Sequence, residues 1–404
     1  MTIKEKIKKL IPPVFLQIYH FKLALLGALV FGFPGYSKKI KIIGVTGTSG
    51  KSTTSDFITR ILEEAGNKVA SISTIRFKIG KKEWENKYKM TMPGRFVIQK
   101  FLTQAVSAGC NFVVLEVSSE GIRQFRHKFI NFDCAVFTNL SPEHIESHGG
   151  FENYRNEKLK LFKACKNIHV INADDENEKY FLDIPAKEKI KFSMKDKEYY
   201  DFDLKLLGDF NIMNALAAIF TARAYGVGFD ACKKALEKAE GIAGRMEVIN
   251  KEPLVVVDYA HTPEQLESVY KSLAKPFNPA QGKNLICVLG SCGGGRDKWK
   301  RPVFGEIAQK YCDKIFITNE DPYDENPLSI MKEIESALSH DGASRKHELV
   351  LDRKKAIEKA IKTAKENEAV IITGKGSEPW MCVANGKKIP WSDKKIAEEI
   401  LNKK

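Results

Sequence analysis

The sequence has no low-complexity stretch and no segment whose composition indicates disorder. Its cysteines also lack the spacings of a zinc site or of a disulfide-stapled scaffold; they occupy positions 110, 134, 165, 232, 287, 292, 312 and 382. Several of them lie in apolar runs, where a free thiol behaves as a small hydrophobic side chain. We therefore expect free thiols and a protein of the reducing cytoplasm.

Acidic residues are in the minority, because 51 Asp and Glu face 65 Lys and Arg and leave a net charge of +14. Such a charge can indicate nucleic acid, anionic lipid or a polyanionic small substrate. The lysines are spread along the chain and no nucleic-acid-binding motif is recognisable, so we expect no nucleic-acid partner. A triphosphate and a phosphorylated substrate fit the same positive field.

The apolar run from Val14 to Phe33 has neither a good cleavage site nor an unbroken apolar core. It follows a group of lysines and is interrupted by polar residues: Lys4, Lys6, Lys8 and Lys9, then Gln17, His20 and Lys22. We expect no signal peptide and no transmembrane span. Residues 1–39 are predicted to form an apolar and basic helical segment, with an amphipathic helix docked on the first domain. Weak attachment to a membrane surface is the alternative.

One segment carries most of the functional information: Gly44-Val-Thr-Gly47-Thr48-Ser49-Gly50-Lys51-Ser52-Thr53-Thr54. It follows a short apolar run and precedes a helical pattern that ends at Gly66. This is the arrangement of a phosphate-binding loop, in which glycines let backbone N–H groups approach phosphate oxygens. Lys51 supplies a positive charge, and the Ser52 hydroxyl can bind Mg²⁺. The sequence therefore predicts a nucleoside triphosphate site.

The rest of the 404 residues alternates between apolar strands and amphipathic helices, and two or three domains are expected from the length. The predicted strands are Phe112 to Val117, Ala135 to Thr138, Ile168 to Asn172, Leu254 to Val257, Leu285 to Gly290, Ile315 to Thr318 and Ala369 to Thr373. Such alternation favours an α/β fold with mainly parallel sheets covered on both faces. A break between two series falls near Gly244-Arg245.

Polar groups follow two of these strands, where parallel strands would bring them to the phosphate loop. Glu116, Ser118 and Ser119 come after the first, and Thr138-Asn-Leu-Ser-Pro-Glu-His144 follows the second. Mg²⁺ prefers oxygen ligands, so Glu116 is an ordinary ligand and His144 a less usual one.

Several motifs, in order from about residue 40 to 400, resemble the ATP-dependent Mur ligases of peptidoglycan synthesis. They are Gly47-Thr-Ser-Gly-Lys-Ser-Thr-Thr54, Leu115-Glu-Val-Ser-Ser119, Thr138-Asn-Leu-Ser-Pro-Glu-His144, Asn211 with Asn214, and Asp258-Tyr-Ala-His261-Thr-Pro. The resemblance is greatest to the ligases that add the third amino acid to a UDP-N-acetylmuramoyl dipeptide. It implies a central ATPase domain (40–244) and a C-terminal Rossmann-like domain (245–404). ATP would phosphorylate a carboxylate, and an amine would displace the phosphate.

The resemblance also implies roles for individual residues. Those implied at ATP are Gly47, Thr48, Ser49, Gly50, Lys51, Ser52, Thr53, Asn211, Asn214, Arg245, Asp258 and His261. Those implied at two Mg²⁺ ions are Ser52, Glu116, His144 and Lys158, the last matching a lysine that these ligases carbamylate. Those implied at the substrates are Thr91, Ser118, Ser119, Arg126, Arg296, Asp321, Gly374 and Glu378. Catalysis would rest on Lys51, Glu116, His144 and Lys158. The partners would be a UDP-MurNAc-peptide and a free amino acid, bound by a monomer.

The chain departs from this family in two respects that concern substrates. The uridine-binding domain usual at the family's N-terminus has no room before Ile40. In addition, Glu320-Asp-Pro-Tyr323 stands where relatives that add diaminopimelate carry Asp-Asn-Pro-Arg, so a different amino acid is expected. Two other functions compete: a related amide ligase for a substrate without UDP, of the folylpolyglutamate or cyanophycin type, and a nucleotide-binding scaffold that recruits a partner through its N-terminal helix.

Overall fold

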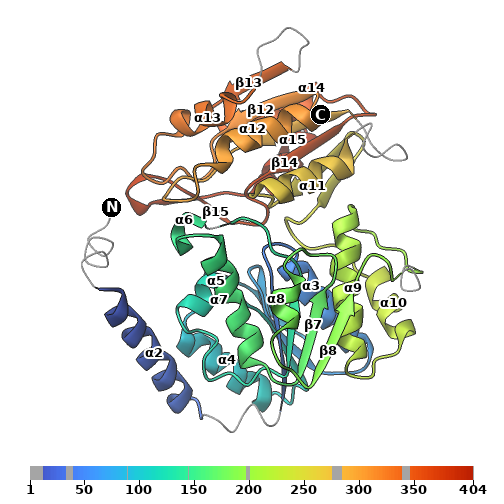
Figure 1. The fold of residues 1–404 in the computed structure, drawn as a ribbon. Helices are drawn as coiled ribbons and strands as arrows, with labels where there is room; N and C mark the ends of the chain where they lie inside the picture. The colour runs from blue at the N-terminus through green and yellow to red at the C-terminus, as the bar shows by residue number, and fades with distance from the viewer. Residues whose placement is uncertain are drawn as a thin grey trace. The chain divides into compact units, whose positions relative to one another are not determined.

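The computed structural model describes residues 12–32, 40–88, 90–143, 145–196, 201–274, 284–338 and 346–403. The chain divides into two compact units (Figure 1). The N-terminal unit comprises Ile7–Lys205 and Asp209–Glu240, and the C-terminal unit is formed mainly by Gly241–Lys404. The predicted segment 1–39 is described only at 12–32, and the predicted metal ligand His144 lies outside the described residues.

The N-terminal unit is built on an eight-stranded sheet in the order β4-β3-β2-β5-β1-β6-β7-β8. Its strands are β1 (Lys41–Thr46), β2 (Val69–Ile72), β3 (Arg76–Ile79), β4 (Lys82–Glu85), β5 (Phe112–Glu116), β6 (Cys134–Phe137), β7 (Ile168–Asn172) and β8 (Glu188–Phe192). The strands from β2 to β8 in this order are parallel, and β3 and β4 extend the sheet as an antiparallel edge. The carboxyl ends of β5, β1 and β6 therefore meet at one edge.

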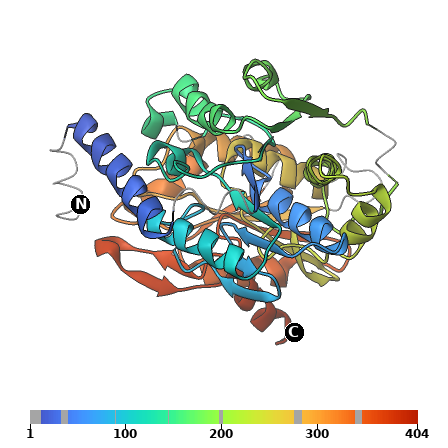
Figure 2. The same ribbon diagram turned by 90° about the horizontal axis from the view of Figure 1, so that it is seen from below.

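Helices cover both faces of this sheet (Figure 2). They are α2 (Pro13–Val30), α3 (Lys51–Glu64), α4 (Arg95–Ser107), α5 (Ser119–Arg123), α6 (Ile145–His148), α7 (Phe151–Ala164), α8 (Glu178–Leu182), α9 (Asp209–Arg223) and α10 (Phe229–Glu237). Helices α3, α9 and α10 pack on one another, and α4 and α7 contribute to the core on the opposite face. The apolar side of α3 is fully buried at Phe57, Ile58 and Ile61, and each such side chain contributes about 1.5–3 kcal/mol.

The C-terminal unit has a six-stranded sheet in the order β13-β12-β11-β14-β10-β9, in which only β9 is antiparallel to its neighbour among the described strands. Its strands are β9 (Glu247–Lys251), β10 (Leu254–Asp258), β11 (Leu285–Leu289), β12 (Lys314–Thr318), β13 (Lys346–Val350) and β14 (Ala369–Thr373), with a separate pair of β15 (Trp380–Cys382) and β16 (Lys388–Pro390). Its helices are α11 (Pro263–Leu273), α12 (Lys300–Tyr311), α13 (Pro327–Glu335), α14 (Arg353–Thr363), η3 (Ala384–Gly386) and α15 (Asp393–Leu401). Helices α11, α12 and α13 pack in series, and α14 packs with α15 over the other face.

The predicted α/β fold with mainly parallel sheets is confirmed, and each of the seven predicted strands is present within one residue of its expected bounds. Strands β2, β3, β4, β8, β9, β13, β15 and β16 were not predicted. Most of them are short and polar; β4, for example, is exposed at every position. An edge strand of this kind carries no run of apolar residues from which it could be recognised.

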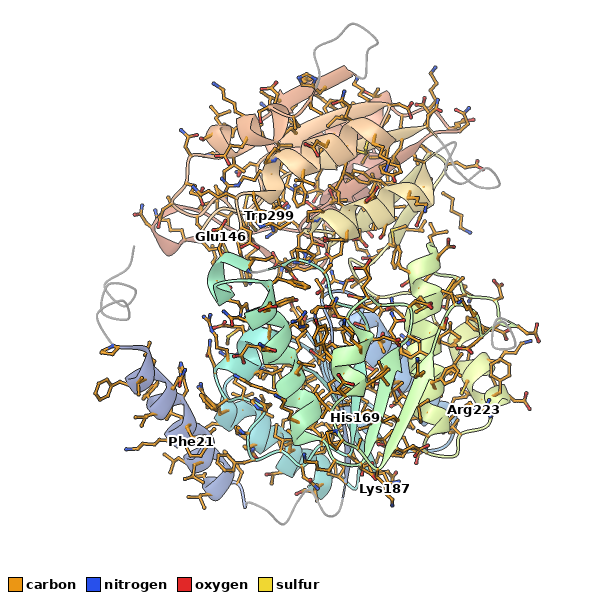
Figure 3. The ribbon with its side chains drawn as sticks, viewed as in Figure 1. Phe21, Glu146, His169, Lys187, Arg223 and Trp299 are labelled. Carbon is orange, nitrogen blue, oxygen red and sulfur yellow. A yellow bond between two sulfur atoms is a disulfide. The ribbon has the colours of Figure 1, made fainter. Side chains whose placement is uncertain are left out.

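Helix α2 packs against α4, and Figure 3 labels Phe21 on it. The Phe21 ring lies 6.0 Å from that of Phe125 and 5.5 Å from that of Phe129, measured between ring centres. The expected amphipathic pattern is absent, because large apolar side chains are on the exposed side of α2 as well. Among the described helices, none is both long and apolar enough to cross a bilayer.

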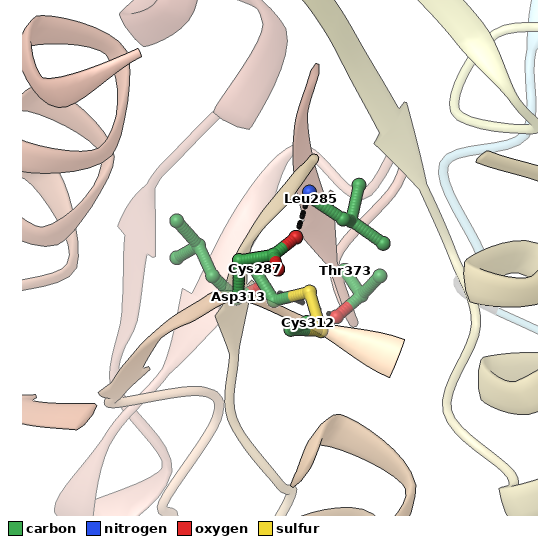
Figure 4. The surroundings of a disulfide bond; sticks show 6 residues. Leu285, Cys287, Cys312, Asp313 and Thr373 are labelled. Atoms are coloured by element: carbon green, nitrogen blue, oxygen red, sulfur yellow. Dashed lines mark hydrogen bonds between the residues drawn. A yellow bond between two sulfur atoms is a disulfide. The ribbon is translucent and has the colours of Figure 1, made fainter. Parts of the chain in front are cut away.

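Two cysteines are joined, contrary to the expectation of free thiols (Figure 4). Cys287 in β11 forms a disulfide with Cys312, which ends α12, and their Cα atoms are 6.1 Å apart. The N–H of Leu285 donates to Asp313 at 2.8 Å beside the bond. The two cysteines are 25 residues apart in sequence, and the β11–α12–β12 crossover brings them together. This proximity depends on strand pairing, so the spacing alone gave no sign of it.

Candidate active site

The predicted phosphate loop connects β1 to α3, and two of its glycines have no room for a side chain. A Cβ atom on Gly47 would lie 1.9 Å from Thr138 Oγ1, and one on Gly50 would lie 2.1 Å from Asn214 Oδ1. Gly50 also has a φ of +77°, a left-handed conformation that favours glycine. Helix α3 therefore begins directly after a closely packed glycine-rich loop. A loop of this kind at a helix N-terminus is the geometry of an anion-binding site.

Neighbouring segments hold the loop in this shape. The Ser49 N–H donates to Asn139 Oδ1 at 2.9 Å, and Thr138 Oγ1 donates to the Ser49 carbonyl at 2.7 Å. On the other side, Thr54 Oγ1 donates to Asn214 Oδ1 at 3.3 Å, and the Asn214 amide donates to Asn211 at 3.2 Å. Segments after β6 and in α9 thus hold the loop from two sides.

Lys51 folds back over the loop. Its Nζ donates to the carbonyl oxygens of Gly47 at 3.0 Å and of Thr48 at 2.7 Å. This holds a positive charge beside the loop N–H groups, where it can neutralise a phosphate.

Glu116 is the centre of a buried polar cluster at the carboxyl end of β5. Ser52 Oγ donates to its Oε2 at 3.0 Å, and the Thr74 N–H donates to the same oxygen at 2.7 Å. The Thr74 hydroxyl also bonds Glu116, at 3.0 Å, and lies 3.0 Å from the Thr91 hydroxyl. Thus a continuous chain of hydrogen bonds runs from the first turn of α3 to the predicted substrate residue Thr91.

Lys158 of α7 is 1% exposed and points at the same loop. Its Nζ donates to the Gly47 carbonyl at 2.7 Å and lies 4.5 Å from the ring centre of Tyr154. Burial, followed by the nearby charge of Lys51, holds the pKa of Lys158 well below its usual value. The Tyr154 hydroxyl in turn lies 3.1 Å from Thr48 Oγ1. The arrangement favours a neutral, nucleophilic amine at this position.

The other predicted substrate residues of the N-terminal unit lie around α5. The Ser118 hydroxyl caps this helix by accepting from the Gly121 N–H at 3.2 Å, and Ser119 is buried. The Arg126 guanidinium donates to the carbonyl of Met92, next to Thr91, and to Gln124 Oε1 at 2.7 Å. Arg126 therefore ties the end of α5 to the Thr91 segment.

In the C-terminal unit, a second polar group surrounds the end of β10. Asp258 accepts from the N–H groups of Met246 at 2.7 Å and Ala260 at 2.6 Å. Its burial raises the pKa of Asp258, although the Arg245 charge and these N–H groups oppose the shift. The Arg245 guanidinium lies 4.2 Å from the ring centre of Tyr259, and the His261 ring lies 4.6 Å from the same ring. Arg245, Asp258 and His261 are thus brought together.

Lys375 contacts two further predicted residues in this unit, Asp321 and Glu378. It is fully buried, with its Nζ 2.8 Å from Asp321 and 2.5 Å from Glu378. Burial alone would lower the pKa of Lys375, but the two carboxylates outweigh it and raise the pKa. Gly374 packs so closely that an added Cβ would lie 2.0 Å from Glu320 Oε2. Arg296 is exposed on the loop after β11, and its charge opposes the burial that raises the pKa of Tyr259.

The structure thus forms two groups from the predicted residues, one in each unit. The N-terminal group is Gly47, Thr48, Ser49, Gly50, Lys51, Ser52, Thr53, Thr91, Glu116, Ser118, Ser119, Arg126, Lys158, Asn211 and Asn214. The C-terminal group is Arg245, Asp258, His261, Asp321, Gly374 and Glu378. Sequence reasoning did not assign roles to Thr74, Tyr154 and Lys375. The only signals for them were a threonine just after β2, a tyrosine one turn before Lys158, and a lysine between two glycines.

Comparison with known proteins identifies the family to which the chain is related. Residues 45–222 match the Mur ligase middle domain, and residues 244–376 match the Mur ligase glutamate ligase domain. A UDP-N-acetylmuramoyl-L-alanyl-D-glutamate--2,6-diaminopimelate ligase from Syntrophomonas wolfei is 36% identical over 411 residues, which cover 95% of this chain and 82% of the relative.

Solved structures agree. A structure of a UDP-N-acetylmuramoyl-L-alanyl-D-glutamate--2,6-diaminopimelate ligase is 29% identical, with a TM-score of 0.60 over 91% of this chain and 79% of its own. Folylpolyglutamate synthase of Mycobacterium tuberculosis, complexed with ADP and AMPPCP, superposes with a TM-score of 0.69 over 90% of this chain and 96% of its own. At 15% identity, that likeness shows the fold alone. Since both halves of the sequence match its domains, the chain belongs to the Mur ligase family and is an ATP-dependent ligase.

Proposed function

We propose that this ligase adds a free amino acid to the peptide of a UDP-MurNAc-peptide, as a cytoplasmic, monomeric enzyme of peptidoglycan precursor synthesis. The observation that carries the proposal is the hydrogen-bond chain Ser52–Glu116–Thr74–Thr91, which joins the phosphate loop to the substrate segment within one unit. The substrate class follows the names of relatives that match across nearly the whole chain. In domain terms, residues 40–244 would hold the ATPase and residues 245–404 the Rossmann-like domain.

The proposed reaction has two steps. A carboxylate oxygen of the peptide attacks the γ-phosphorus of ATP, ADP leaves, and an acyl phosphate forms. The amine of the incoming amino acid then attacks the acyl carbon. The bond between that carbon and the phosphate oxygen breaks, inorganic phosphate leaves with the electron pair, and the nitrogen loses a proton. Lys51 and the loop N–H groups neutralise the phosphate charge, and binding of both substrates in one site supplies proximity.

The residues at the phosphate loop suit Mg²⁺ bound mainly through ATP and water. Mg²⁺ typically takes one or two protein oxygens and keeps the remaining positions for phosphate and water. Ser52 Oγ and the Glu116 carboxylate are 3.0 Å apart at the start of α3 and would provide these oxygens. Among the described residues, no group of three or more His, Cys, Asp or Glu is placed to hold a metal by itself. Bound there, the ion would neutralise phosphate charge.

A second Mg²⁺ site is proposed at Lys158. Its depressed pKa and burial favour reaction of the neutral amine with CO₂, which would convert a cation into an oxygen ligand. His144 is proposed as a further ligand, on the sequence alone.

The incoming amino acid is proposed to bind at Asp321, Gly374 and Glu378, and to differ from diaminopimelate. Tyr323 occupies the position of the arginine expected for a distal carboxylate. The side chain of Tyr323 packs on Gly294, where an added Cβ would lie 2.6 Å from the ring. The neighbouring Glu320 is buried, and the nearby Lys375 ammonium already pairs with Asp321 and Glu378.

The direct test is phosphate release from ATP and Mg²⁺ in the presence of UDP-MurNAc-L-Ala-D-Glu, with amino acids supplied one at a time. We expect release that requires both the muropeptide and one amino acid, and a product whose mass equals their sum less water. Phosphate release with a carboxylate substrate that lacks UDP, together with no release with the muropeptide, would contradict the proposal. It would indicate a related amide ligase instead. ATP binding without release under any condition would favour the scaffold.

Thr74→Val tests whether Thr74 positions Glu116. Valine keeps the shape and the backbone N–H bond but removes the hydroxyl, so we expect the Mg²⁺ concentration for half-maximal release to rise about tenfold. Thr103→Val is the matched control, because the Thr103 hydroxyl bonds only backbone carbonyls, of Gln99 and Phe31. An unchanged Mg²⁺ dependence in Thr74→Val would show that the hydroxyl does not hold Glu116.

A further inference from the structure

Helix α2 distributes its side chains in the reverse of an ordinary surface helix. The fully buried residues of α2 are small: they are Ala24, Gly27 and Ala28. A Cβ atom added to Gly27 would lie 3.6 Å from the backbone of α4. The residues that face outward are large and apolar. Phe15 is 63% exposed and Leu29 is 60% exposed. Large apolar side chains normally point to the core, so this face requires a partner.

The exposed residues form one continuous stripe. Phe15, Tyr19, Lys22, Leu26 and Leu29 follow one another at intervals of four and three residues, which places them on one side of a helix. Ile18 and Val30 flank the stripe and are also exposed. Only one charged side chain, Lys22, interrupts it, and a lysine can extend its ammonium away from apolar surroundings.

The sequence that contains α2 is strongly basic. Within residues 1–39 there are seven lysines and one glutamate. The elements that α2 contacts add no carboxylate: α4 carries Arg95 and Lys100, and the loop 124–130 carries Arg126 and Lys128. Lys100 and Lys128 are exposed. An apolar stripe bordered by cations complements a surface that is apolar inside and anionic at its edge.

A second copy of the chain fits this surface poorly. The four-and-three spacing resembles a coiled-coil seam, but Lys22 stands at its centre and would face its equivalent across a symmetric dimer. The exposed Lys100 and Lys128 would add repulsion between like charges. An anionic lipid surface would place no second Lys22 opposite the first and would attract the lysines rather than repel them.

We propose that α2 lies in the plane of an anionic lipid membrane, with the stripe at Phe15, Tyr19, Lys22, Leu26 and Leu29 among the acyl chains and with Lys100 and Lys128 at the headgroups. The helix remains packed on α4 through its small residues and anchors the N-terminal unit reversibly to the membrane. This proposal is independent of which substrate the ligase uses.

Flotation of the full chain with phosphatidylcholine vesicles, with and without phosphatidylglycerol, tests the proposal. We expect partitioning into anionic vesicles at least about tenfold stronger than into neutral ones, and weaker binding as salt is raised. The variant Phe15→Gln/Leu29→Gln should bind anionic vesicles at least about tenfold less well. Its ATP binding and thermal unfolding should be unchanged, because both side chains are exposed.

The matched control is Leu351→Gln/Ile389→Gln, which alters two exposed apolar residues of the C-terminal unit (45% and 48%) and should float like the parent chain. Equal binding to neutral and anionic vesicles, or equal flotation of the α2 variant and the parent, would overturn the proposal. So would a parent chain that is dimeric by light scattering and becomes monomeric in the α2 variant, because the stripe would then join two copies.

Discussion

Lys51→Ala is expected to abolish ATP turnover, with kcat at least about a hundredfold lower. The Lys51 ammonium is held over the loop by the carbonyl oxygens of Gly47 and Thr48, which orient its charge toward the phosphate position. Preorganised charge of this kind acts mainly on the transition state, because no reorganisation is needed as phosphate charge shifts during transfer. Phosphate release with saturating ATP, Mg²⁺ and muropeptide measures the effect.

An exposed lysine of the same unit provides the control. Lys81→Ala removes a charge at the turn before β4 and should leave kcat unchanged. Because the Lys51 side chain also bonds the loop, the fold of the variant needs a check by thermal unfolding. Turnover that survives in a folded Lys51→Ala protein would mean that this loop is not the phosphate site.

Lys158→Ala is expected to lower phosphate release at least about a hundredfold, and short carboxylic acids should restore part of it. The side chain is buried against the Gly47 carbonyl and Lys51 suppresses its protonation, so alanine leaves a space beside the loop where a carboxylate can replace a carbamate. Acetate and formate should therefore rescue the variant in proportion to their concentration. The same acids should have little effect on the parent enzyme.

Two comparisons separate this chemistry from a structural role. Lys160→Ala alters an exposed lysine of the same helix, paired with Glu157, and should retain full activity. Lys158→Met fills the space with an uncharged chain and should be inactive with or without added acid. Full activity of Lys158→Ala in the absence of acid would refute the carbamate, and loss without rescue would assign Lys158 to packing of the loop.

Much of the fold could be predicted from residue patterns because buried parallel strands are short apolar runs. β7 and β14 lie at their predicted bounds, and β1 and α3 flank the loop as expected. The predicted position of Glu116 at a strand end also placed it near Ser52, since adjacent parallel strands end at the same edge. These features depend on local sequence and on one general rule of sheet topology.

Contacts between distant segments could not be predicted in this way. Thr74 is next to Glu116 because β2 pairs with β5, and nothing in the sequence around Thr74 signals that pairing. Lys375 meets Asp321 for the same reason, as β14 and β12 flank β11. For α2, the sequence predicts one apolar and one polar face, whereas its fully buried residues are small and large apolar side chains are also exposed.

The close packing around Gly47 and Gly50 restricts how the gene can vary. One added methyl group at either position would collide with a side chain from a different segment, Thr138 in one case and Asn214 in the other. To relieve either collision, the Thr138 or Asn214 side chain would have to move, and the bond from Thr138 to the Ser49 carbonyl or from Thr54 to Asn214 would be lost. A missense change at either codon is therefore expected to disturb contacts between segments far apart in the sequence as well as the loop itself.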